Sequence, residues 1–237
     1  MAKKEFPDKP LPKIKEPPAA GDNSGLMGAF TSKMSALSSR SFGVIKFILG
    51  VALLPFVFSF VVSFLNEFGL VAKPLQAIFY NGLISFLAIY LFVWEPVAIY
   101  NRGHKLLELV FNFFKPMVNV APFLLPIYTI FIFVFYGLLS FSIKSDWLLN
   151  YALFLIGFSI ILHLVFSAKT IRSKKGDFLK ANYIFGLSFI LILNIALLAL
   201  GFSLIFKEFS FVNFCNISFN IAKNIFYVIF KQLFLFK

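Results

Sequence analysis

The sequence carries little charge for its length. Only 14% of its 237 residues are Asp, Glu, Lys or Arg, whereas 60% are hydrophobic. A soluble domain of this size is usually about a quarter charged, because polar side chains must cover its surface. The composition therefore excludes a soluble globular protein and, beyond the N-terminal region, an intrinsically disordered one. Since an open sheet would leave unpaired backbone groups in lipid, we predict an all-α integral membrane protein.

The sequence is also poor in metal ligands and thiols. It contains one cysteine, Cys215, and two histidines, His104 and His163. One cysteine cannot form an intrachain disulfide, and this set is too small for the usual zinc or haem sites. We therefore expect no metal and no cofactor, and we interpret Cys215 as a small apolar residue.

Familiar catalytic patterns are missing as well. The sequence has no GxxxxGK[ST], GxGxxG, HExxH or GxSxG motif, which excludes the common phosphate-binding, dinucleotide-binding, zinc-protease and hydrolase signatures. No two carboxylates share a predicted membrane span, so the usual acid/base pairs are absent too. These absences favour a non-enzymatic protein without excluding an enzyme.

Long apolar runs dominate what remains. Five runs come close to the ~20 residues that a helix needs to cross the bilayer, and together they define a five-span transmembrane domain over residues 42–208. The predicted spans are Val44–Leu65, Leu75–Trp94, Met117–Leu139, Trp147–Phe166 and Tyr183–Phe206. The expected fold is a polytopic bundle of these five helices followed by a C-terminal amphipathic helix.

Two different segments precede the first span. Residues 1–23 are rich in proline and lysine, a composition typical of a solvated, disordered tail. Residues 24–41 place apolar side chains at steps of three and four, which predicts an amphipathic helix on the membrane surface. The apolar positions are Leu26, Met27, Phe30, Met34 and Leu37.

The C-terminal segment, 209–237, carries polar residues along one helical stripe. We call this set the asparagine stripe: Asn213, Asn216, Asn220, Lys223 and Asn224. The members follow one another at steps of three and four, so they share one face of a helix. We favour an amphipathic helix at the outer membrane interface, with a sixth span as the alternative, and we expect the stripe to be a docking face.

Basic residues predict the orientation of the chain in the membrane. Fifteen Lys and Arg residues lie in segments 1–43, 101–116 and 168–182, whereas two lie in 66–74 and 141–146. The positive-inside rule then places the N-terminus in the cytoplasm. The formal charge of +12 indicates contact with anionic lipid headgroups rather than with nucleic acid. A bacterial inner membrane is the expected location.

Polar residues inside the predicted spans are candidate functional residues, because burying them in lipid is costly. Glu95 and His163 lie at a similar predicted depth and could form a pair that relays protons. The alternative is that Glu95 pairs with Arg102 or Lys105 at the interface while His163 reaches towards the headgroups. Two further candidates are Asn81 and Asn194, which we expect to hydrogen-bond neighbouring helices.

Three functions are compatible with this sequence. The first is a non-enzymatic subunit, scaffold or assembly factor that acts through helix–helix and anionic-lipid contacts, with a protein partner or a second copy of the chain. The second is a small transporter or channel with a polar intramembrane site around Glu95 and His163. The third is a lipid-modifying membrane enzyme, which has the least support because no nucleophile or metal set accompanies the candidate acid and base.

Overall fold

The computed structural model describes residues 23–112, 121–143, 145–173 and 183–234. Within these ranges, side chains are described from Gly43 onward, Ser173 excepted. The predicted tail up to residue 22, the start of the third predicted span, and most of the basic 168–182 segment lie outside the described residues.

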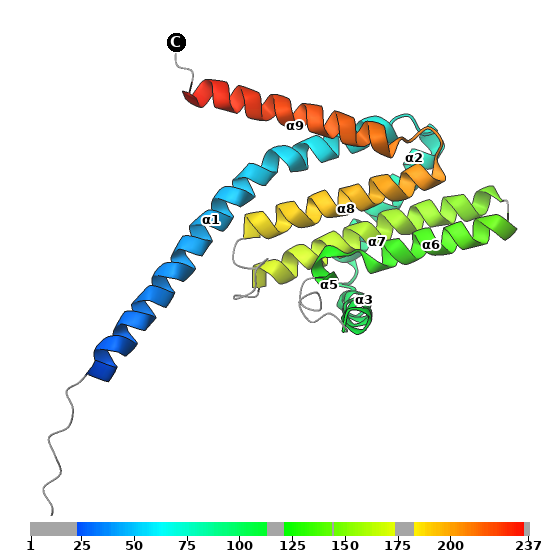
Figure 1. The fold of residues 1–237 in the computed structure, drawn as a ribbon. Helices are drawn as coiled ribbons and strands as arrows, with labels where there is room; N and C mark the ends of the chain where they lie inside the picture. Colours follow the sequence, from blue (N-terminus) through cyan, green and yellow to red (C-terminus); the bar gives the residue numbers. More distant parts are fainter. Residues whose placement is uncertain (1–22, 113–120, 144, 174–182, 235–237) are drawn as a thin grey trace, which may run out of the picture. The chain divides into compact units, whose positions relative to one another are not determined.

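The described residues form helices and no strand, which confirms the predicted all-α class (Figure 1). The helices are α1 (Asn23–Phe68), α2 (Lys73–Phe92), α3 (Val97–Val110), α5 (Ala121–Leu124), α6 (Ile127–Ser142), α7 (Asp146–Ser173), α8 (Tyr183–Ile205) and α9 (Phe211–Phe234).

Four of these helices are long and apolar enough to cross a membrane. They are residues Gly43–Phe68 of α1, the whole of α2, residues Asp146–Arg172 of α7, and α8. A chain with several such helices is a multi-pass membrane protein. The structure thus contains four long candidate spans where the sequence predicted five.

The predicted span that is not among these four is the third, which is interrupted by proline. Helix α5 ends at Leu124, and α6 begins only after Pro126. Proline has no N–H to donate and its ring clashes with the preceding turn, so the predicted continuous helix over Met117–Leu139 is divided in the described part of that range. The apolar helix that remains, α6, has 16 residues, or about 24 Å of length.

The chain divides into two compact units, Met1–Phe42 and Gly43–Lys237. In the first unit, the described residues form the start of α1, so the backbone of the predicted surface helix over 24–41 is helical. The side chains that would make it amphipathic lie outside the described residues. The described side-chain contacts belong to the second unit.

The most extensive helix contact joins α2 and α7, which run in the same direction. Along this pair, the rings of Phe86 and Phe158 lie 5.2 Å apart and those of Tyr90 and Phe166 lie 5.9 Å apart. Two glycines allow the close approach: a Cβ atom added at Gly82 or Gly157 would overlap a backbone carbonyl oxygen of the other helix. Small residues serve the same purpose in membrane helix pairs generally.

Phenylalanine rings fill the core between these helices. Phe202 of α8 is fully buried, and its ring lies 5.1 Å from that of Phe68 in α1 and 5.4 Å from that of Phe79 in α2. Aromatic pairs at such distances add stability beyond the area that they bury. This one cluster therefore ties α1, α2 and α8 together.

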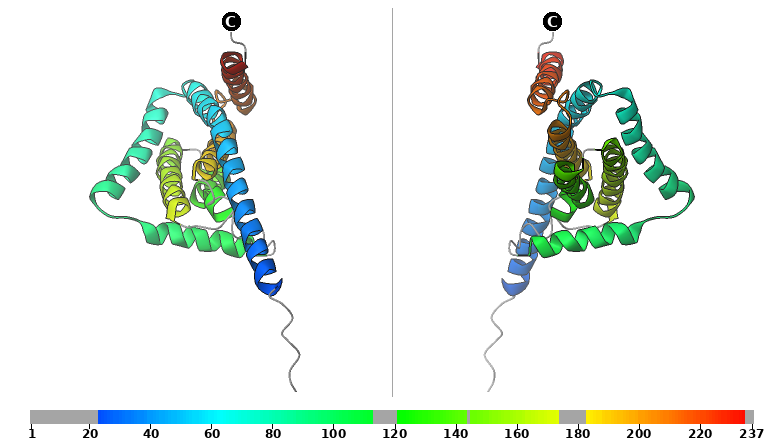
Figure 2. Two further views of the ribbon diagram at one scale, coloured as in Figure 1. Left: turned by 90° about the vertical axis from the view of Figure 1, so that its left-hand side faces the viewer. Right: turned by 90° about the vertical axis from the view of Figure 1, so that its right-hand side faces the viewer.

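Helix α3 runs across the longer helices. It is seen end-on in Figure 1, where α6, α7 and α8 are seen lengthwise. In Figure 2, α3 is seen lengthwise and the other three helices are foreshortened. Its buried residues, Tyr100, Gly103 and Leu107, follow at steps of three and four. This amphipathic helix contacts α5, α6 and α7, and so it covers the polar residues described next.

Candidate functional site

A chain of buried polar side chains lies between α3 and α7. The hydroxyl of Tyr100 is 3.3 Å from Oγ of Ser167, which in turn is 3.4 Å from Nε2 of His163. His163 is 5% exposed and Ser167 is fully buried. Burial raises the pKa of Tyr100, so its phenol stays protonated and able to donate. This arrangement can hold a proton or a small polar ligand.

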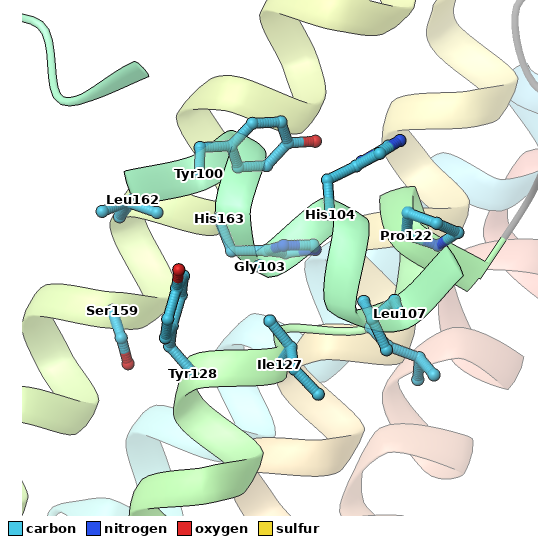
Figure 3. Close-up of a pocket in the computed structure, with 11 residues that line it drawn as sticks. Tyr100, Gly103, His104, Leu107, Pro122, Ile127, Tyr128, Ser159, Leu162 and His163 are labelled. Atoms are coloured by element: carbon cyan, nitrogen blue, oxygen red, sulfur yellow. The ribbon is translucent and has the colours of Figure 1, made fainter. Parts of the chain in front are cut away.

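A cavity of about 10 Å³ lies next to this chain (Figure 3). Its lining includes His163, Ser159, Tyr128 and His104. A cavity of roughly this volume has room for a single water molecule, provided that polar groups surround it. The lining supplies those groups, so the site suits one water molecule rather than a larger ligand.

The polar chain continues towards the middle of the bundle through Ser159 and Thr129. Their hydroxyl oxygens lie 2.8 Å apart and join α7 to α6. Both side chains are buried, with exposed fractions of 6% and 2%. Together with Tyr100, Ser167 and His163 they form what we call the polar track.

Asn194 lies deep in the bundle, where it is fully buried. Its side-chain amide donates hydrogen bonds to the carbonyl oxygens of Leu124, at 3.1 Å, and Ile190, at 2.8 Å. The carbonyl of Leu124 stands at the end of α5, where Pro126 interrupts the helix. Asn194 therefore satisfies a backbone group that the interruption leaves without a helical partner.

Glu95 lies between α2 and α3 and pairs with Lys169 of α7. Lys169 Nζ donates to Glu95 Oε1 at 2.6 Å, and both side chains are about half exposed. The structure therefore brings together neither Glu95 with His163 nor Glu95 with Arg102 or Lys105. His163 instead is buried six residues before Lys169 along α7, facing Ser167 and the backbone of Phe123.

Replacing Glu95 by glutamine is expected to leave the thermal unfolding midpoint nearly unchanged at neutral pH, because exposed ion pairs contribute little. The hydrogen bond from Lys169 lowers the pKa of Glu95 from its ordinary value of 4.5. The contribution of the pair is therefore complete above pH 4.5 and is lost as the pH falls through the lower value of the folded state. As the pH falls below 4.5, the small difference between the unfolding midpoints of wild type and Glu95→Gln should disappear. A large difference between the two midpoints at neutral pH would contradict the small contribution expected of this ion pair.

Replacing Tyr100 by phenylalanine is expected to destabilise the protein by about 0.5–1.5 kcal/mol, the usual net contribution of one hydrogen bond. The variant removes the bond to Ser167 and keeps the ring stacked on Phe166, 5.3 Å away. Unfolding in detergent measures the loss. Tyr151→Phe is the matched control, since Tyr151 is 65% exposed, and equal effects of the two changes would refute the role of the Tyr100 hydroxyl.

The remaining candidates from the sequence lie on the surface of the second unit. Asn81 of α2 and every member of the asparagine stripe are exposed. The residues of α9 that face the bundle are Phe214, Ser218 and Ala222. The stripe is therefore free to meet another molecule, except that Asn213 also contacts the end of α1.

That contact is with Glu67, which lies two residues beyond the predicted end of the first span. Glu67 is 2% exposed. Its carboxylate accepts a hydrogen bond from the Ser210 backbone N–H at 2.9 Å and a short one from the Asn213 side chain. Because these donors stand at the start of α9, the carboxylate also meets the positive end of the helix dipole. Glu67 thus attaches α9 to α1.

The described residues contain no group of three His, Cys, Asp or Glu side chains that could hold a metal ion. Comparison of the chain with known protein families, with curated proteins and with solved structures finds no match. The function must therefore be argued from the chain's own surfaces and buried groups.

Proposed function

We propose that this protein is a non-enzymatic subunit or assembly factor of a membrane complex, which binds other proteins through exposed polar positions on its helices. The observation that carries the proposal is the asparagine stripe. It is exposed along α9, while the opposite side of that helix packs on the bundle through Phe214, Ser218 and Ala222. Amide side chains that face neither protein nor water are costly in a membrane.

Asn81 supports the same proposal from a second helix. It lies near the middle of α2, which is long and apolar enough to span a membrane, and it is exposed. The buried amide nitrogen of Asn194 has such partners in the carbonyl oxygens of Leu124 and Ile190. An exposed amide at membrane depth has the same need, which a neighbouring helix of another protein would meet.

The basic segments suit the cytoplasmic face in this proposal. With the N-terminus in the cytoplasm of a bacterium, residues 1–43, 101–116 and 168–182 face anionic headgroups of the inner membrane. Each basic residue near the surface adds about 1 kcal/mol of attraction. Helix α3 presents Arg102 and Lys105, both exposed, on the side away from its buried residues.

Photocrosslinking in native membranes tests the proposal. A benzophenone amino acid at Asn216, in the stripe, is expected to give one defined adduct with another protein after irradiation. The same group at Leu233, which is exposed near the end of α9 and away from the stripe, serves as the control and should label lipid instead. A chain that stays a lone monomer after crosslinking and in mild detergent would refute a role as a subunit.

A transporter is the second candidate, and the polar track supports it. His163, Ser167, Ser159 and Thr129 are buried polar groups within an apolar bundle, and they adjoin a water-sized cavity. Such residues mark proton or ion paths in other membrane proteins. Purified protein in vesicles loaded with a pH-sensitive dye would show proton flux that His163→Gln abolishes. If wild type and variant leak equally, the track is structural.

A further inference from the structure

The direction of α9 decides what its exposed stripe meets. At the start of α9, Ser210 and Asn213 contact Glu67 near the end of α1. Further along, the ring of Phe214 lies 5.3 Å from that of Phe60. Beyond this, the ring of Phe226 lies 5.4 Å from that of Phe56. As α9 advances, its contacts move back along α1, so the two helices run antiparallel.

Figures 1 and 2 agree with these contacts. Helices α9 and α8 are both seen lengthwise in Figure 1, where they meet at the start of α9, and both are foreshortened in the turned views of Figure 2. A helix that lay flat on the outer interface would instead cross α1 and α8 near one end. The contacts thus favour the sixth-span alternative over the interfacial helix, although α9 is not among the four helices whose composition is apolar enough for a membrane span.

This direction takes the stripe to membrane depth. Phe56 and Phe60 belong to Gly43–Phe68, an apolar stretch long enough to span the bilayer. They lie about 10–16 Å along α1 from Glu67 at 1.5 Å per residue. Asn220 and Lys223 fall between the α9 residues that contact them. The middle of the stripe is therefore level with the interior of that span, where water is scarce.

Helix α9 divides into a buried and an exposed side at this depth. The buried side packs on the bundle through Phe214, Ser218 and Ala222. The exposed side holds the asparagine stripe, and apolar side chains border the stripe, with Phe219 at 65% and Phe230 at 59% exposure. The stripe carries an exposed lysine, and no carboxylate in the described part of the chain pairs with it.

We propose that the asparagine stripe binds a membrane helix of a different protein, and that this helix carries one Asp or Glu level with Lys223. The inference rests on the proposed function as a subunit and specifies the chemistry of the partner. Charge complementarity requires the carboxylate, because an ammonium group in lipid needs an opposite charge. Amide or hydroxyl side chains one turn away on the partner would pair with Asn216 and Asn220.

A second copy of this chain fits the stripe less well. Two copies inserted in the same orientation would bring Lys223 against Lys223, and like charges in a medium of low dielectric repel strongly. The spacing of three and four along the stripe is the spacing at which two helices pack with a left-handed twist. A single helix of another protein can therefore follow the stripe along its length.

Model peptides test this chemistry directly. The full chain carries a donor dye on Cys215, its single cysteine, which is exposed at the start of α9. It is reconstituted in phosphatidylcholine vesicles with an acceptor-labelled oligoleucine transmembrane peptide that has Asp at its centre. Matched peptides carry Leu or Lys at that position. Energy transfer should show the Asp peptide binding about tenfold more tightly than the Leu peptide, which corresponds to about 1.4 kcal/mol, and the Lys peptide not binding.

Two variants place the effect at the stripe. Lys223→Leu should abolish the preference for the Asp peptide. Lys207→Leu should retain it, because Lys207 is exposed in the turn before α9. Equal binding of all three peptides would overturn the proposal. Transfer between donor-labelled and acceptor-labelled copies of the chain, persisting on dilution with lipid, would overturn it in favour of a second copy.

The acidic partner helix and the role as a subunit can fail independently of each other. If native membranes yield a crosslinked partner whose binding Lys223→Leu does not change, the protein remains a subunit and the acidic partner is wrong. If the peptides discriminate as expected but native membranes yield no partner, the stripe has the stated chemistry and the role as a subunit fails.

Discussion

Adding a single methyl group at Gly157 is expected to destabilise the protein, whereas the same change at Gly137 is expected to stabilise it. A Cβ atom at Gly157 would overlap the carbonyl oxygen of Phe79 and lie 3.2 Å from the backbone nitrogen of Leu83. Both are backbone atoms, so the two helices would have to move apart. Overpacking of this kind costs about 1–3 kcal/mol, and occasionally more.

Gly137 provides the matched control because a Cβ atom there would have nothing within 4 Å. It lies inside α6, where alanine is a better helix former than glycine by about 0.8–1.0 kcal/mol. Thermal unfolding in detergent, followed by circular dichroism, should shift to lower temperature for Gly157→Ala and to higher temperature for Gly137→Ala. Shifts of the same sign would show that the contact between α2 and α7 is less close than described.

Gly82 extends this prediction. A Cβ atom there would overlap the carbonyl oxygen of Phe154 in the same contact between α2 and α7. Once one substitution has separated the helices, the second has less contact left to disrupt. The double variant Gly82→Ala/Gly157→Ala should therefore lose less stability than the two single losses added together.

Replacing Glu67 by alanine is expected to release the start of α9 from α1. The change leaves the Ser210 N–H and the Asn213 amide without their buried acceptor, at a cost of about 1–3 kcal/mol. Glu67→Gln should have a smaller effect, since its amide oxygen can still accept one of these hydrogen bonds. Glu208→Ala, at an exposed position in the turn before α9, is the control and should change nothing.

Thiol accessibility measures this release. Ser218 faces the bundle from α9 and is 2% exposed, so a cysteine there should react slowly with maleimide when α9 is packed. In a Cys215→Ser/Ser218→Cys background, Glu67→Ala should speed the reaction, and Glu208→Ala should not. An unchanged rate with Glu67→Ala would show that the aromatic contacts of Phe214 and Phe226 hold α9 without the carboxylate.

The helical class and most of the long apolar helices could be predicted from the sequence, because both follow from local properties. Length and hydropathy identify a span one segment at a time. The third predicted span shows the limit of this reasoning. Hydropathy over Met117–Leu139 does not register that Pro126 separates α5 from α6, although proline is the residue most able to interrupt a helix.

The polar contacts could not be predicted because they depend on which helices meet. Glu95 had several basic residues within reach in the sequence, and the parallel packing of α2 and α7 places Lys169 beside it. Glu67 was missed because the first span was predicted to end at Leu65, whereas α1 continues to Phe68. A carboxylate within one turn of a span's end was the available signal. Gly82 and Gly157 carried no signal, since a glycine in an apolar run reveals its contact only once the partner helix is known.

The contact of Glu67 with α9 also bears on how the chain is assembled during synthesis. Its partners, Ser210 and Asn213, follow it by 143 and 146 residues. Helix α1 enters the membrane long before α9 has left the ribosome, and during that interval the carboxylate has neither partner. Helices α1, α2 and α8 can already pack together through Phe68, Phe79 and Phe202 before α9 is available. The attachment of α9 to α1 is therefore a late step in the assembly of the bundle.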